Sequence, residues 1–319
     1  MKAVGLLSGG LDSTLAAQLM IEQGIKVHAI NFTSPFCQCT PKSSCCASVV
    51  TAVRQLGDIQ LQRVVLGDDY LHMIASPRHG YGRGMNPCLD CRIMKIRKAG
   101  EYMREIEASF LFTGEVLGQR PMSQHKRALA LIDRNSGMGD LTVRPLSAHH
   151  FQPTLPEREG WIDRAKLLSI QGRSRKEQIG LAQHKGIADY PCPAGGCLLT
   201  DKNFAGRMRD YLQHIPQPSL HDIPLLKTGR HFRLPNGDKV IVARDEQEGK
   251  RLTGLHRSED HLLTPENFSG PVVLLQGSAL DAAIERLLAY TKNQPAGAVT
   301  IACKHLDSSF FINAVAKTQ

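Results

Sequence analysis

Residues 2 to 24 have the sequence KAVGLLSGGLDSTLAAQLMIEQG, which contains three patterns in succession. The apolar run at 2 to 7 predicts a strand, and Ser8-Gly9-Gly10 predicts a turn. The apolar residues that follow recur at helical spacing as far as Gly24. A second apolar run, VHAINF at 27 to 32, predicts another strand. Strand, turn, helix and strand form a βαβ unit, so we expect an α/β domain with a doubly wound parallel sheet.

The rest of the chain extends this domain and then changes character. Further strands are expected at 60 to 66, 110 to 113 and 141 to 144, and a helix at 92 to 107. After Tyr211 the sequence becomes rich in proline and loses its periodicity. We therefore predict two domains, residues 1 to 214 and residues 215 to 319. The second is expected to be a small α+β domain, with two strands around an Asn236-Gly237 turn, strands at 271 to 275 and 298 to 302, and a helix at 280 to 292.

Composition bounds the class of protein. The chain has 319 residues, of which 42% are hydrophobic and 22% charged, values that are typical of folded globular domains. No run of 18 apolar residues is present, so we expect no membrane contact and a cytoplasmic protein with reduced thiols. The formal net charge of +9 favours a polyanionic partner such as nucleic acid.

The glycine turn has the chemistry of a phosphate site. Backbone N–H groups at a helix N-terminus form a positive cradle for anions, and adjacent glycines allow close approach. The hydroxyls of Ser8 and Ser13 can donate to the same oxygens, and Asp12 can cap the helix or hold Mg²⁺. The chain has neither a GxxxxGK[ST] motif nor a GxGxxG motif after a strand, so Walker and dinucleotide sites are not expected. A plain βα turn remains the alternative.

SGGLDS at 8 to 13 resembles the SGGxDS signature of the PP-loop ATP pyrophosphatases. The resemblance implies that ATP loads AMP onto a substrate oxygen, which makes that oxygen a good leaving group, and that pyrophosphate is released. Asp12 is then a catalytic residue, and the implied ATP site comprises Leu7, Ser8, Gly9, Gly10, Asp12, Ser13 and Asn31.

A second block resembles the family of ThiI, the 4-thiouridine synthetases. Its residues run from Phe112 to Gln119 (FTGEVLGQ), continue with Ser123-Gln124 and end at Arg144-Pro145-Leu146. The resemblance covers roughly residues 2 to 200, implies tRNA as substrate, and adds Gly114, Glu115 and Gln119 to the ATP site. A glycine-rich surface loop is the alternative. We find no counterpart of the N-terminal RNA-capture region or of the rhodanese domain of long ThiI enzymes. The run at 229 to 237 (GRHFRLPNG) resembles the RNA-binding domain of NFACT proteins, and a purely structural hairpin domain is the alternative.

Three cysteines are candidates for sulfur chemistry. Cys88 and Cys91 form a CxxC expected directly before a helix, and Cys197 lies far along the chain. The motif NPxxxC at 86 to 91 also resembles the MnmA family, where it carries a catalytic cysteine that corresponds to Cys91, with Cys197 matching the second. Related thiolases imply a 4Fe–4S cluster on Cys88, Cys91 and Cys197. The alternatives are a persulfide on Cys91 or Cys197, with the other cysteine resolving it, and a structural zinc ion or plain buried thiols.

Two further groups of residues are candidates for binding. The first is a set of four clustered cysteines, which suits either a zinc ion or scattered loop thiols: Cys37, Cys39, Cys45 and Cys46. The second is a set of basic residues near the cysteines and in the C-terminal run, which suits either RNA phosphates or a solvated surface: Arg92, Lys95, Arg173, Arg175, Arg230 and Arg233.

These observations predict an ATP-dependent enzyme that adenylates a tRNA uridine and replaces its oxygen with sulfur, at position 4 in preference to position 2. ATP, Mg²⁺ and a 4Fe–4S cluster are the expected cofactors, and sulfide or a cysteine desulfurase the expected sulfur donor. Two other functions remain open: a PP-loop enzyme acting on a small molecule, and an RNA-binding factor with a vestigial ATP site. The sequence leaves the oligomeric state open.

Overall fold

The computed structural model describes residues 1–37, 45–57, 59–190, 196–292 and 297–315. They divide into two compact units, Met1–Ala205 and Gly206–Gln319, and the division falls inside helix α8 (Lys202–His214). The domain limits taken from the sequence stay a prediction. Within the described residues, no helix combines the length and apolarity needed to cross a membrane.

The first unit contains a five-stranded parallel sheet in the order β3-β2-β1-β4-β5. Its strands are β1 (Lys2–Leu6), β2 (Lys26–Thr33), β3 (Gln60–Val65), β4 (Phe110–Thr113) and β5 (Thr142–Val143). Leu6 pairs with both Ile30 and Thr113, so the three central strands end at the same edge of the sheet. The predicted α/β class is confirmed, and this edge is where loops of such sheets bind ligands.

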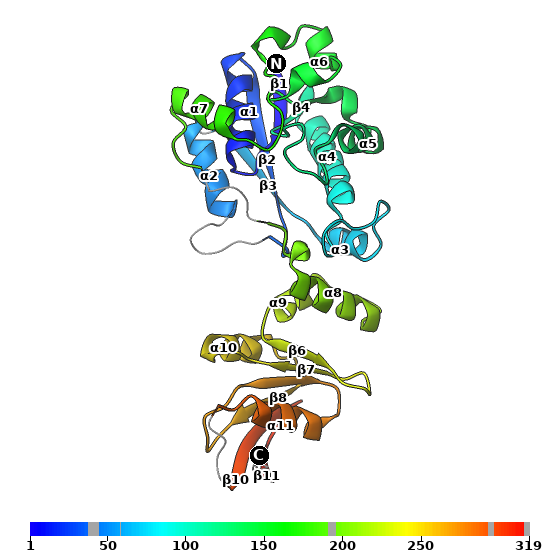
Figure 1. The fold of residues 1–319 in the computed structure, drawn as a ribbon, viewed down its shortest axis with the longest axis vertical. Helices are drawn as coiled ribbons and strands as arrows, with labels where there is room; N and C mark the ends of the chain where they lie inside the picture. Colours follow the sequence, from blue (N-terminus) through cyan, green and yellow to red (C-terminus); the bar gives the residue numbers. More distant parts are fainter. Residues whose placement is uncertain (38–44, 58, 191–195, 293–296, 316–319) are drawn as a thin grey trace. The chain divides into compact units, whose positions relative to one another are not determined.

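Helices cover both faces of this sheet (Figure 1). One face packs against α1 (Leu11–Glu22), α2 (Cys45–Gln55) and α7 (Lys176–His184). The other packs against α4 (Cys88–Glu105) and α5 (Lys126–Ser136). Because side chains alternate along a strand, Ala3 belongs to the first core and Val4 to the second. The remaining helices of this unit are α3 (Asp68–Ala75) and the short α6 (Leu155–Arg158).

The CxxC lies inside a helix, which corrects the sequence-based expectation that it precedes one. Helix α4 begins at Cys88, whereas its start was expected at Arg92. Cys88 and Cys91 therefore occupy the first helical turn at i, i+3 spacing, which places them on one face.

The second unit is a six-stranded antiparallel sheet in the order β11-β10-β8-β9-β7-β6, so the predicted α+β domain is confirmed. Its strands are β6 (Arg230–Arg233), β7 (Lys239–Val242), β8 (His261–Pro265), β9 (Val273–Gln276), β10 (Ala298–His305) and β11 (Ser308–Val315). Its helices after α8 are α9 (Ile223–Leu226), α10 (Glu246–Leu255) and α11 (Leu280–Ala289). The turn at Asn236-Gly237 joins β6 to β7 as expected, whereas β8, β11 and α10 were not anticipated as elements.

Candidate functional site

The glycine turn is held in shape by its own serines. The Ser13 hydroxyl donates to the Gly10 carbonyl oxygen at 2.9 Å and accepts from the Ser8 backbone N–H at 3.2 Å. Gly9 has a φ of +77°, and a Cβ there would lie 2.5 Å from backbone atoms of Ser48 and Val49 in α2. Only glycine fits this position, because both the backbone angle and the space exclude a side chain. The turn is thus a fixed platform at the N-terminus of α1.

Three acceptor oxygens beside this turn have no hydrogen-bond partner among the described residues. They are Asp12 Oδ1, Asn31 Oδ1 and Gln119 Oε1, and all three are buried. The opposite ends of the same side chains are fixed. Gln119 Nε2 donates to Asp12 Oδ2 at 2.9 Å, and Asn31 Nδ2 donates to the Leu7 carbonyl oxygen at 2.8 Å. Buried polar atoms are normally paired, so these oxygens point to a ligand such as a hydrated cation.

Gly114 brings the second sequence block into contact with the glycine turn. A Cβ on Gly114 would lie 2.5 Å from both the backbone nitrogen and the Cα of Ser13, and 2.6 Å from the carbonyl carbon of Asp12. Such distances are well below van der Waals contact. The loop after β4 therefore packs directly on the first turn of α1, and any side chain at Gly114 would force the two apart.

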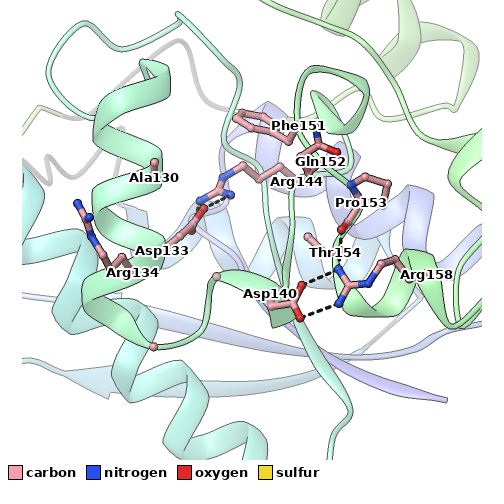
Figure 2. A pocket seen from close by; sticks show the side chains of 12 residues that line it. Ala130, Asp133, Arg134, Asp140, Arg144, Phe151, Gln152, Pro153, Thr154 and Arg158 are labelled. Carbon is pink, nitrogen blue, oxygen red and sulfur yellow. Dashed lines mark hydrogen bonds and ion pairs between the residues drawn. The ribbon is translucent and has the colours of Figure 1, made fainter.

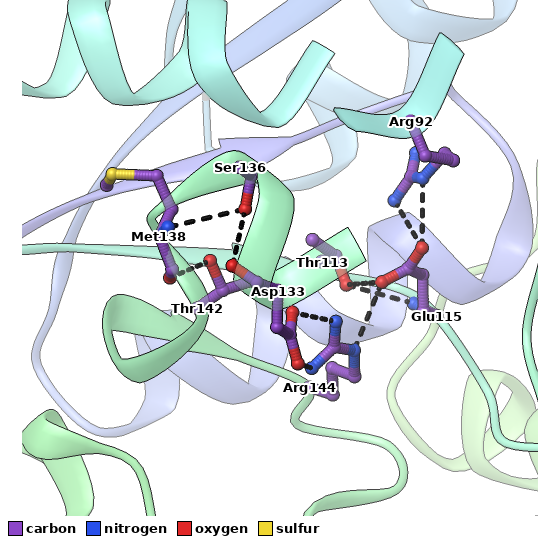
Figure 3. A network of polar contacts seen from close by, with 8 residues as sticks. All are labelled: Arg92, Thr113, Glu115, Asp133, Ser136, Met138, Thr142 and Arg144. Atoms are coloured by element: carbon purple, nitrogen blue, oxygen red, sulfur yellow. Dashed lines mark hydrogen bonds and ion pairs between the residues drawn. The ribbon is translucent and has the colours of Figure 1, made fainter. Parts of the chain in front are cut away.

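Glu115 is the centre of a buried ionic network (Figure 3). Arg92 Nε donates to its Oε1 at 2.9 Å, and Arg144 Nε donates to its Oε2 at 3.1 Å. Arg144 also forms two hydrogen bonds to Asp133, at 3.0 and 2.7 Å. Burial raises the pKa of Glu115, but the two guanidinium groups outweigh burial and hold it below its usual value. Glu115 thus joins α4, through Arg92, to the loop that carries Gly114.

The three predicted sulfur residues lie in one region, around Tyr70. Burial raises the pKa of Cys88, and nearby Cys91 raises it further. Burial also raises the pKa of Cys197 to about 12, with Cys91 and Cys88 adding to the rise. The Tyr70 hydroxyl donates to Cys91 Sγ at 3.4 Å. Burial and then the neighbouring Cys91, Cys197 and Cys37 raise the pKa of this phenol. Thiols from three separate segments therefore lie close together in one partly buried region.

The fourth thiol in this region, Cys37, was grouped with other cysteines in the sequence analysis. Cys39 lies outside the described residues, as do the side chains of Cys45 and Cys46, so the predicted zinc set stays a prediction. Cys37 instead faces Cys197 across an isolated antiparallel bridge. Among the described residues, no three His, Cys, Asp or Glu side chains are arranged to hold a metal ion.

The predicted basic residues occupy different environments. Arg92 is committed to Glu115, and Arg233 forms an ion pair with Asp210 at 2.9 Å. Lys95, with Arg120, lies close enough to Cys88 to oppose the rise of its pKa. Two others, Arg173 and Arg175, lie just before α7, Arg173 exposed and Arg175 partly buried. Finally, Arg230 stacks over the Tyr290 ring at 4.9 Å.

A hollow of about 610 Å³ lies beside the ionic network (Figure 2). Arg144 lines it and stacks over the Phe151 ring at 5.4 Å, and an exposed Arg158–Asp140 ion pair at 2.8 Å forms part of its wall. None of the predicted site residues lines this hollow. It is therefore separate from the glycine turn and the thiols.

Sequence reasoning missed several residues that the structure brings to the site. Tyr70 and Arg120 belong to no motif, and their approach to the thiols depends on tertiary packing. The sequence shows Asp133 only as a residue of a helix and gives no sign that it pairs with Arg144 in the ionic network. For Arg144, the RPL motif was a usable signal.

Comparison with known families agrees with this geometry. The parallel sheet and the glycine turn after its first strand have the arrangement expected of a PP-loop domain. Residues 1–150 match the family model described as "Thiamine biosynthesis protein (ThiI)", and residues 229–319 match "NFACT protein RNA binding domain". Both resemblances drawn from the sequence are confirmed as resemblances: residues 1–150 are similar to the ThiI family and residues 229–319 to the NFACT RNA-binding domain.

The similar curated proteins are tRNA-modifying by name. A "Probable tRNA sulfurtransferase" of Methanosarcina acetivorans is 32% identical over 128 residues, which cover 36% of this chain and 28% of the relative. The "tRNA-specific 2-thiouridylase MnmA" of Leptospira biflexa is 30% identical over 127 residues, 35% of this chain and 33% of the relative. The matched stretch thus spans about a third or less of either protein. The crystal structure of a 4-thiouridine synthetase–RNA complex with bound ATP covers 71% of this chain and 52% of its own, with 19% identity and a TM-score of 0.40. A TM-score this low adds no weight to the assignment.

Proposed function

We propose that this chain is an ATP-dependent tRNA sulfurtransferase acting in the cytoplasm. The observation that carries the proposal is the buried acceptor set of Asp12, Asn31 and Gln119 beside a rigid glycine turn. Asp12 belongs to the glycine-turn motif and Gln119 to the ThiI-like block, so the set joins both sequence motifs. The names of the relatives support tRNA as substrate, and the ThiI match favours 4-thiouridine over 2-thiouridine.

ATP is proposed to bind with its phosphates at the N-terminus of α1, where Gly9 and Gly10 allow the backbone N–H groups to approach the oxygens. Asp12 would hold Mg²⁺, since its buried Oδ1 is without a partner among the described residues and carboxylate oxygens are ligands that Mg²⁺ prefers. The ion neutralises phosphate charge when bound.

The proposed reaction has two parts. A uridine carbonyl oxygen attacks the α-phosphorus of ATP, pyrophosphate leaves, and AMP becomes attached to the base oxygen. A sulfur nucleophile then attacks the same ring carbon, and AMP departs with the oxygen. The region around Cys88, Cys91 and Cys197 would supply the sulfur, which originates from sulfide or from a cysteine desulfurase.

The form in which sulfur is carried is tested by elemental analysis. The donor set of three thiols suits the predicted 4Fe–4S cluster chemically, but the described residues do not hold the thiols in metal-binding geometry. Anaerobically purified wild type is compared with Cys88→Ala. About four irons per chain, absent from the variant, support the cluster. An iron-free, folded wild type supports a persulfide.

The second unit is proposed to hold the tRNA. It contains two cation–aromatic stacks, Arg230 over Tyr290 at 4.9 Å and Arg286 over Phe232 at 4.7 Å, and Phe311 is 69% exposed. Aromatic and guanidinium faces bind unstacked bases and phosphates without reading a duplex. Arg230 is the stronger candidate of the two predicted arginines, because Arg233 is bound to Asp210.

The experiment measures pyrophosphate release and the thiouridine content of digested tRNA, with ATP, sulfide and unmodified tRNA as substrates. Wild type is expected to release pyrophosphate only when tRNA is present, and Asp12→Ala to release none while still binding tRNA. Pyrophosphate release without tRNA would favour a small-molecule substrate. Tight tRNA binding with no pyrophosphate from wild type would indicate a vestigial ATP site.

A further inference from the structure

Cys37 and Cys197 are opposed across the backbone, although 160 positions separate them in the sequence. They are partners in an isolated antiparallel bridge, and Leu198 N–H donates to the Phe36 carbonyl oxygen at 2.8 Å. This hydrogen bond joins the flanking residues, so the two cysteines form the non-hydrogen-bonded type of pair. In such pairs the Cα atoms are about 4.5 Å apart and the side chains leave the same face. A disulfide requires Cα atoms about 4.4 to 6.8 Å apart, so this backbone can accept one.

The surroundings of the pair suit thiol chemistry. Both thiols are free and partly buried. The Ser34 hydroxyl lies 3.6 Å from Cys37 Sγ, where it can donate a hydrogen bond to a developing thiolate. The aromatic rings of Phe36, Tyr70 and Phe204 pack next to the bridge, with centroid separations of 6.0 and 6.1 Å from Phe36. These contacts fix the bridge in place.

We propose that Cys37 is the resolving thiol for Cys197 in sulfur transfer. This proposal rests on the proposed function. The outer sulfur of a Cys197 persulfide, loaded by a persulfide-bearing donor, attacks the adenylated ring carbon. AMP leaves, and the base is joined to Cys197 through a disulfide. The Cys37 thiolate then attacks Cys197 Sγ. The bond between Cys197 and the base sulfur breaks, its electron pair stays on that sulfur, and the thiocarbonyl product is released. The new Cys37–Cys197 disulfide is reopened by two electrons from a dithiol reductant.

The geometry also favours Cys37 over Cys91 as the resolving thiol. Cys91 sits in the first turn of α4, and its sulfur accepts a hydrogen bond from Tyr70. Cys37 alone among the described cysteines is paired with Cys197 through the backbone. A resolving thiol must reach the sulfur that it attacks without a large rearrangement, and this bridge provides that.

The first measurement is a disulfide map of the full-length chain, which needs no activity. The protein is oxidised mildly with glutathione disulfide, its thiols are alkylated, and its peptides are analysed by mass spectrometry without reduction. The expected result is one dominant cross-link between Cys37 and Cys197, lost in Cys37→Ser and retained in the matched control Cys88→Ser. A dominant Cys91–Cys197 cross-link, or no cross-link to Cys197, overturns the proposal.

The second measurement tests the role itself, with donor-loaded enzyme, ATP and tRNA in the absence of a dithiol. Wild type is expected to release thiolated tRNA once per chain. In Cys37→Ser the tRNA should remain bound to Cys197, so that free product falls at least about tenfold and recovers when dithiothreitol is added. Equal release from the variant without dithiothreitol overturns the role of Cys37. If wild type makes no thiouridine while the map shows the cross-link, the proposed function and with it the resolving role fall, and only the disulfide stands. Iron bound through Cys197 in the active protein also overturns the role.

Discussion

Replacing Gly114 with alanine should impair ATP binding far more than it impairs folding. The added Cβ would lie 2.5 Å from backbone atoms of Ser13, about 0.9 Å short of ordinary contact at 3.4 Å. Neither partner is a flexible side chain, so the loop after β4 or the first turn of α1 must move by nearly that distance. Overpacking of this kind costs about 1 to 3 kcal/mol. If the strain is relieved by opening the phosphate cradle, ATP affinity falls by about 5- to 150-fold.

The assay is isothermal titration of ATP and Mg²⁺ into wild type and Gly114→Ala, with a thermal melt of each protein. Gly180→Ala is the matched control, because it adds the same methyl group in helix α7, where no described atom beyond the adjoining backbone of that helix lies within 4 Å of the new Cβ. The control should bind ATP normally and melt at the same or a slightly higher temperature. Wild-type affinity in Gly114→Ala would refute the close packing of the two sequence blocks. A melting temperature too low to leave folded protein would mean that the strain is not local to the cradle.

Three other predictions concern stability. Glu115→Gln removes one of the two anionic partners of Arg144, whose side chain is 4% exposed and keeps Asp133, and should cost about 2 kcal/mol, seen as a melting temperature lower by about 4 to 8 °C; an unchanged melt contradicts this. Burial lowers the pKa of His231 to about 3, so folding opposes its protonation. The contribution of neutral, buried His231 to the free energy of unfolding is fully present above the unfolded pKa of about 6.5. This contribution falls by on the order of 4 kcal/mol at most as the pH drops towards 3. Urea unfolding at pH 7 and at pH 4 measures this loss as a difference in the free energy of unfolding. In His231→Gln that difference between the two pH values should be smaller. Burial raises the pKa of Asp210, but hydrogen bonds from Arg233 and Lys239 outweigh it and lower it to about 2. Asp210→Asn should therefore destabilise the second unit by about 1 kcal/mol at neutral pH, since solvent screens this partly exposed group; a thermal melt equal to that of wild type would mean that these ion pairs do not contribute.

Local sequence patterns predicted much of the fold, because each strand, turn and helix at the start of the first unit is indicated by its own short stretch of residues. The strands at β3 and β4 were expected within one residue of their observed limits, and the glycine turn fell where two flanking patterns met. Helix α4 was expected four residues too late, because cysteine gives no helix signal and Pro87 supplies its N-cap without a side-chain hydrogen bond. Proline is well tolerated at such a start.

The second unit was harder for a physical reason. Strands β10 and β11 are joined at Leu306, which has a φ of +51° although leucine rarely adopts that conformation. The turn therefore lacks the glycine or asparagine that normally reveals a hairpin. At the candidate site, the opposition of Cys37 and Cys197 and the contact between Gly114 and Ser13 join residues at least a hundred positions apart. No local pattern encodes such contacts.

A short series of contacts through Gly114 and Glu115 connects the glycine turn to helix α4. At one end of this path Gly114 packs against Ser13 in the glycine turn. At the other end Glu115 forms an ion pair with Arg92, the residue after Cys91. Because the Glu115 carboxylate is buried and paired with both Arg92 and Arg144, a small displacement of the turn should be transmitted along this path. We therefore expect that a ligand bound at the glycine turn changes the position of α4, and that a displacement of α4 alters binding at the turn.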